Sequence, residues 1–135
     1  MDAHLNPTKQ WALLRSTAVT GDSTTVPLIM RGQDATNAHT VTNGVVDLLP
    51  NKTYIISAGL PIDTATIVKN MGVQKSVDGT NRSTAFGSGF SGVYGGNTSG
   101  TSLEDVLVTT QPMKLRIVSA SNGLNAGVWL RLQVM

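Results

Sequence analysis

The sequence predicts an all-β fold, an antiparallel β-sandwich or jelly roll of about seven or eight strands with an extended N-terminal arm and a long Gly-rich loop. Three observations lead to this fold class. Short segments alternate apolar and polar residues with a period of two, turn-forming Gly, Pro and Asn separate these segments, and no segment has the period of a long helix. Strands do not alternate with helices, which argues against a Rossmann-type parallel sheet.

The chain has 135 residues, enough for one domain with a substantial core. Residues 1–8 are polar and contain Asn6-Pro7, so we expect an extended arm that either frays or grips a neighbouring molecule. A single β-sandwich domain is expected over residues 9–135. Its first segment, residues 9–19, favours a strand, and a short helix over residues 10–15 is the alternative.

Further strands are expected where β-branched and apolar residues cluster between turn signals, at residues 24–30, 44–49, 53–58, 63–69, 71–77 and 103–109. Pro27 restricts the first of these to a sheet edge, a bulge or the start of a pairing, because proline donates no backbone hydrogen bond. Residues 31–43 are predicted to be a loop that ends near Thr40. The Leu49-Pro50-Asn51-Lys52 turn predicts that the segments on either side of it form a hairpin.

The segment from Met113 to Met135 is predicted to be a second hairpin, with Asn122-Gly123 and Gly127 in its turn region. One apolar set comprises Met113, Leu115 and Ile117, and the other comprises Val128, Leu130, Leu132 and Val134. A period of two places each set on the buried face of its strand, so Trp129 and Arg131 are expected on the outward face.

Residues 80–100 are predicted to be a long loop, because glycines recur at short intervals and no strand or helix period survives there. Loops of this length in a compact domain are usually functional or disordered. Phe86, Phe90 and Tyr94 are candidates for anchoring the loop to its own domain, for stacking on a sugar or for inserting into a neighbouring subunit. The subunit contact is favoured, since buried aromatic anchors dominate many protein interfaces.

The charge balance disfavours several classes of partner. Ten Lys and Arg residues face eight Asp and Glu residues, and the cations are scattered along the chain, so we expect no nucleic-acid partner. No apolar run is long enough to span a bilayer, so we expect no membrane partner. The absence of cysteine excludes disulfides and thiolate metal sites. The first residues lack the pattern of a signal peptide, so we expect synthesis in a cytoplasm and release, if any, by lysis.

Residue types that often carry catalysis occur here in unsuitable settings. The match of residues 87–92 to the dinucleotide-binding fingerprint lacks the flanking strand and helix. His4 and His39 are expected to be solvated, with no second metal ligand beside either of them. Glu104 and Asp105 are adjacent on a strand, so they face opposite sides and are poor partners for acid–base work. We therefore expect no enzymatic activity, no catalytic residue, no metal site and no cofactor.

The chain as a whole combines small size, no cysteine, a polar arm ahead of Trp11, Thr- and Gly-rich strands, a glycine-rich loop and a terminal Gly127-Val128-Trp129-Leu130-Arg131-Leu132 strand. In this combination it resembles the small jelly-roll decoration (cement) proteins of tailed bacteriophage capsids. The resemblance implies a homotrimer, made in the host cytoplasm, that sits on the capsid exterior and clamps adjacent subunits of the major capsid protein. It brings no catalytic residues with it.

Three regions are expected to make these contacts: the arm (His4, Leu5, Trp11), the aromatic loop (Phe86, Phe90, Tyr94) and the outward face of the last strand (Trp129, Arg131). The alternative function is a receptor- or glycan-binding module of a phage fibre or tail. In that case Phe90 or Tyr94 would contact the ligand, and substituting either would abolish binding without affecting assembly.

Overall fold

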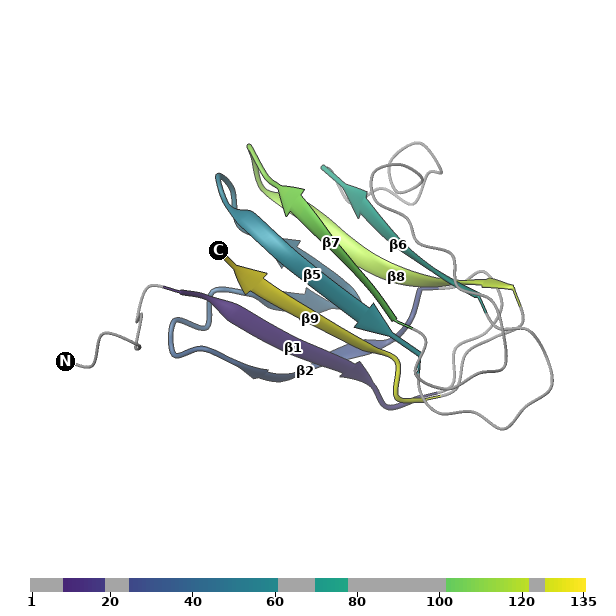
Figure 1. Ribbon diagram of the computed structural model, residues 1–135. Coiled ribbons are helices and arrows are strands. Elements are labelled where there is room, and N and C mark those ends of the chain that lie inside the picture. The colour runs from purple at the N-terminus through teal and green to yellow at the C-terminus, as the bar shows by residue number, and fades with distance from the viewer. Residues whose placement is uncertain (1–8, 19–24, 61–69, 78–101, 122–125) are drawn as a thin grey trace.

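The computed structural model describes residues 9–18, 25–60, 70–77, 102–121 and 126–135, and these residues form two antiparallel sheets with no helix (Figure 1). The five-stranded sheet has the order β2 (Leu28–Gln33), β1 (Trp11–Ser16), β9 (Trp129–Val134), β5 (Thr53–Gly59), β7 (Ser102–Val108). The four-stranded sheet has the order β3 (Thr40–Thr42), β4 (Val45–Leu48), β8 (Met113–Ser121), β6 (Asn70–Ser76).

A single apolar core lies between the two sheets. The five-stranded sheet contributes Leu14, Tyr54, Ile56, Leu130 and Leu132, and the four-stranded sheet contributes Val46, Met71, Val73, Leu115 and Ile117. Every one of these side chains is fully buried. Because alternate residues of each strand point inward, burial of these apolar side chains supplies the main stabilisation of the sandwich. The predicted fold class is confirmed.

The first segment forms a strand, β1, and the helical alternative over residues 10–15 is wrong. Its burial alternates strictly, with Ala12, Leu14 and Ser16 inside. β2 begins directly after Pro27 at the edge of its sheet, one of the positions that proline allows. The segments predicted at residues 63–69 and 80–100 and the arm at residues 1–8 lie outside the described residues.

Both predicted hairpins are wrong in their pairing, although their strands are present. β8 lies in the four-stranded sheet and β9 in the five-stranded sheet, so the tail crosses from one layer to the other. β4 and β5 are divided between the sheets in the same way. In each case the two strands lie in different sheets, and their alternation would look the same in a hairpin.

The loop predicted at residues 31–43 is also wrong in part. β2 continues to Gln33, and β3 occupies residues 40–42 and pairs with β4 as a hairpin. The turn of this hairpin is Asn43-Gly44, and both residues have positive φ, 51° and 79°. Asn-Gly between alternating residues is the strongest short-range signal for such a hairpin, so the sequence contained the signal for this pairing.

The crossing from β4 to β5 is fixed by side chains that satisfy its backbone. The Leu49 N–H donates to the Tyr54 hydroxyl at 2.9 Å, and the Thr109 hydroxyl donates to the Leu49 carbonyl at 2.6 Å. The Lys52 N–H donates to the Thr109 hydroxyl at 3.0 Å. Thr109 is buried, so these bonds hold the turn against the end of β7.

Candidate functional site

The side of the five-stranded sheet that points away from the core, called the outer face below, carries an unusual set of residues. Strand register places its side chains in rows across the sheet. One row runs Trp11–Gln133–Ile55–Val106, the next runs Leu13–Arg131–Ser57–Glu104, and the third runs Ile29–Arg15–Trp129–Gly59. These residues come from all five strands, β1, β2, β5, β7 and β9.

Exposed apolar side chains concentrate on the outer face. Among the described residues, seven large apolar side chains are exposed, and five of them lie here: Trp11 (43%), Leu13 (39%), Ile29 (41%), Val106 (55%) and Val108 (61%). The other two, Val77 and Met135, follow the ends of strands. Single exposed apolar residues are ordinary on a protein surface, but several gathered on one face are typical of an interaction site.

Both tryptophans lie against the sheet over a glycine of the neighbouring strand. The Trp129 ring occupies the space in which a side chain of Gly59 would stand. The Trp11 ring lies 3.6 Å from the position that a Cβ atom of Gly32 would take. Glycines inside strands commonly mark such close approaches. Each ring therefore covers the glycine of the neighbouring strand on the outer face.

The polar groups of the outer face are only partly satisfied. The Ser57 hydroxyl donates to a carboxylate oxygen of Glu104 at 3.2 Å. Within the described part of the chain, the guanidinium groups of Arg15 and Arg131 make no hydrogen bond and no ion pair. Arginine is enriched at protein interfaces because its planar, weakly hydrated head forms paired hydrogen bonds.

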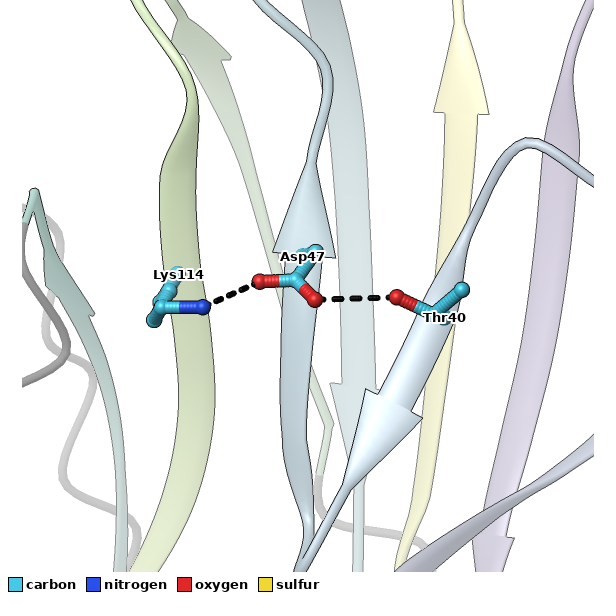
Figure 2. A network of polar contacts seen from close by, with 3 residues as sticks. All are labelled: Thr40, Asp47 and Lys114. Carbon is cyan, nitrogen blue, oxygen red and sulfur yellow. Dashed lines mark hydrogen bonds and ion pairs between the residues drawn. The ribbon is translucent and has the colours of Figure 1, made fainter.

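On the four-stranded sheet, the surface that points away from the core carries polar side chains that bind one another. Asp47 accepts a hydrogen bond from Thr40 at 2.9 Å and forms an ion pair with Lys114 (Figure 2). The hydrogen bond from Lys114 lowers the pKa of the Asp47 carboxyl, and the hydrogen bond from Thr40 lowers it further. Arg116 donates to Gln74 and Thr25. The two surfaces of the sandwich thus differ in chemistry, because five of the seven exposed large apolar side chains in the described part of the chain lie on the outer face.

His39 is buried, with 1% of its surface exposed, so the expectation of a solvated His39 is wrong. Its Nε2 lies 2.8 Å from the Tyr54 hydroxyl, and this contact joins the residue ahead of β3 to β5 in the other sheet. The backbone of His39 is held by the Gln33 side chain through two 3.2 Å hydrogen bonds. The expectation failed because the polar neighbours of His39 in sequence do not report which side chains the fold turns inward.

Three of the residues predicted to make contacts lie together. Trp11, Trp129 and Arg131 occupy the neighbouring strands β1 and β9 on the outer face, and Trp129 is half-buried there. The other predicted contact residues, His4, Leu5, Phe86, Phe90 and Tyr94, lie outside the described residues. Sequence reasoning missed the further members of the outer face, Leu13, Arg15, Ile29, Val106 and Val108, although the alternation of β1 already places Leu13 and Arg15 beside Trp11.

Among the described residues, no group of three His, Asp or Glu side chains is arranged to hold a metal ion. Glu104 and Asp105 lie on β7, opposite Ser57 and Ile56, and so point to opposite sides of the strand as expected. No helix in the described part of the chain is long and apolar enough to cross a membrane.

No family model matches the sequence, and no curated protein matches it. Solved structures do match the fold. Murine APRIL at pH 5.0 superimposes with a TM-score of 0.71 and 12% identity, covering 95% of this chain and 100% of that one. The PRD1 vertex protein P5 superimposes with a TM-score of 0.63 and 14% identity, covering 94% and 96%. At these identities the likenesses show the fold alone: the chain is a jelly-roll β-sandwich.

Proposed function

We propose that this chain is a structural protein of a bacteriophage virion, which forms a homotrimer on the capsid exterior and stabilises the assembled capsid. The observation that carries the proposal is the outer face, where five exposed apolar side chains share one surface with two arginines that have no partner among the described residues. Exposing apolar side chains to water is unfavourable, and burying them in an assembly lowers the free energy. We propose no enzymatic activity, catalytic residue or cofactor.

The likeness to the PRD1 vertex protein P5 supports a virion role, because that protein is by name a part of a phage particle and has the same jelly-roll fold. The composition supports the same role. Only 13% of residues are charged, against about 25% in ordinary soluble domains, and uncharged polar surfaces suit packing against other subunits.

The proposed mechanism is mass action. A protein that binds only the assembled lattice of the major capsid protein stabilises that lattice by its binding free energy. Three linked copies raise the effective concentration of each contact, so weak individual contacts hold the trimer in place. We propose that the arm with His4 and Leu5, and the loop with Phe86, Phe90 and Tyr94, contact the capsid.

The first test is a heat-release assay. Phage heads produced without this protein are heated with and without the purified chain, and release of DNA is followed by a dye. The proposal expects release at a lower temperature without the chain and recovery when it is added. A release temperature that does not respond to the chain would contradict the stabilising role, and a specific signal on a glycan array would then favour the receptor-binding alternative.

A second test removes the arm. Deleting residues before Lys9 should weaken attachment to heads while the fold persists, because the described sandwich begins after this segment. Circular dichroism provides the control for folding. Attachment at the full-length level would remove the arm from the contact regions.

A further inference from the structure

We infer that the outer face binds a second copy of this chain head to tail, with the β7 side of one copy packed on the β1–β9 side of the next. The inference rests on the proposed trimer and names the surface that forms it. It is carried by the distribution of charge and exposure across the outer face.

Charge is divided between the two sides of the outer face. The cations are Arg15 on β1 and Arg131 on β9, and the anion is Glu104 on β7. Asp105, on the other face of the same edge strand, adds to the negative charge there and is exposed. A basic side and an acidic side on one surface are complementary when one copy places its acidic side against the basic side of another.

Arg131 and Glu104 stand in the same row of the sheet with Ser57 between them. Two strand spacings separate their Cα atoms by about 10 Å, and no ion pair joins them within the described residues. The Ser57 hydroxyl instead holds the Glu104 carboxylate at its own edge of the sheet. Both charges are therefore available to a partner copy.

The apolar residues are divided in the same way. The exposed Trp11, Leu13 and Ile29 form one cluster on β1 and β2, while the exposed Val106 and Val108 form another on β7. Between the clusters lie Arg131, Ser57 and the half-buried Ile55 and Trp129. In the head-to-tail contact the two clusters meet each other, and Glu104 meets an arginine. Desolvation by the apolar clusters strengthens that ion pair.

Exposure distinguishes this packing from a face-to-face dimer. The most exposed apolar side chains of the outer face are Val106 and Val108, on the edge strand β7, which has no further strand beside it among the described residues. A face-to-face dimer covers the centre of the sheet and leaves its edges in water. Packing an edge of one copy onto the face of the next covers these valines, and such heterologous contacts close into a ring when the rotation permits.

Charge reversal tests the inference. Sedimentation velocity over a range of concentrations is measured for the wild-type chain, for Arg131→Glu, for Glu104→Arg and for the double variant. Each single reversal should raise the dissociation constant of the trimer at least about tenfold, because like charges then meet in the contact. The double variant should recover most of the loss, since it restores the pairing in reverse. Thr42→Glu, at an exposed position of the four-stranded sheet, is the matched control and should sediment as wild type.

The outcomes separate this inference from the proposed function. Wild-type sedimentation of both single variants, or a double variant no better than either of them, would overturn the head-to-tail pairing. The proposed function would not be contradicted in that case, because attachment of the wild-type chain to heads is measured separately. Conversely, a trimer that responds to reversal and rescue but does not attach to heads would uphold the inference and contradict the virion role.

Discussion

His39 is the residue whose chemistry depends most on the fold. It is buried against Tyr54, and its Nδ1 has no hydrogen-bond partner among the described residues. Burial lowers the pKa of His39 below its ordinary value of 6.5, and the charge of Asp34 offsets part of this effect. Protonating His39 in the folded state would place a poorly paired charge inside the sandwich, which is costly.

This pKa shift predicts a loss of stability in mild acid. The unfolded chain takes up a proton on His39 near pH 6.5, whereas the folded chain does so only at lower pH. The free energy of unfolding should therefore be largest above pH 6.5 and fall as the pH drops through the window below it. Asp47, whose pKa is lowered from 3.8, loses its contribution only in stronger acid.

Urea unfolding between about pH 7.5 and pH 5 measures the effect, with His39→Gln as the control. The slope of the unfolding free energy against pH should be smaller in the variant, because its glutamine does not titrate. Identical slopes in the two proteins would show that another group causes the acid sensitivity.

Gly59 and Gly32 each lie beside a tryptophan ring of the neighbouring strand, but at different distances. A Cβ atom at Gly59 would overlap the Trp129 ring, whereas one at Gly32 would make an ordinary contact with Trp11 at 3.6 Å. Gly59→Ala should lower the unfolding free energy by about 1–3 kcal/mol, the usual cost of overpacking. Gly32→Ala should change it by less than about 0.5 kcal/mol. Equal effects in urea unfolding would mean that Trp129 does not lie over Gly59 in solution.

At the scale of the element, the sequence predicted strand positions well and strand pairing poorly. β1 and β5 were predicted from β-branched and apolar residues beside turn signals. Alternation with a period of two predicted β8 and β9, because one face of each strand must be apolar in a sandwich. The same period appears whether the next strand pairs in the same sheet or crosses to the other one. Nothing in the alternation around residues 49–52 distinguishes the observed crossing from a hairpin.

For the candidate site too, the sequence predicted the outward side chains of single strands but not how the strands combine. Trp129 and Arg131 could be assigned to the outward face from the alternation of one strand, but the outer face is assembled from strands far apart in sequence. Val106 and Val108 come to lie near Ile55 only because β7 pairs with β5. Contacts of this kind depend on strand order, which the sequence pattern of single strands does not contain.

The Asn43-Gly44 turn carries a prediction about the β3–β4 hairpin. Gly44 has φ of 79°, and a Cβ atom there would overlap the carbonyl oxygen of Val26. Gly44→Ala should lower the unfolding free energy by about 1–3 kcal/mol or more, since strain and overlap add. Asn43→Gly, which also accepts positive φ, is the control and should be nearly neutral. A neutral Gly44→Ala in urea unfolding would contradict the described turn.

At the scale of the whole molecule, the two surfaces of the sandwich differ in the side chains that they expose. On the four-stranded sheet, Asp47 pairs with Lys114 and accepts a hydrogen bond from Thr40 (Figure 2). The outer face of the five-stranded sheet exposes apolar side chains and two arginines, Arg15 and Arg131, that have no partner in the described part of the chain. This asymmetry is the physical basis for proposing that the chain works as a subunit within a larger particle.

Density-gradient sedimentation of a lysate from the source, followed by immunoblotting of the fractions, tests that claim most directly. We expect the chain to migrate with a particle of megadalton size and to be released by mild denaturant. Mass spectrometry of the particle should identify the major capsid protein. A chain confined to the slow fractions would contradict the account.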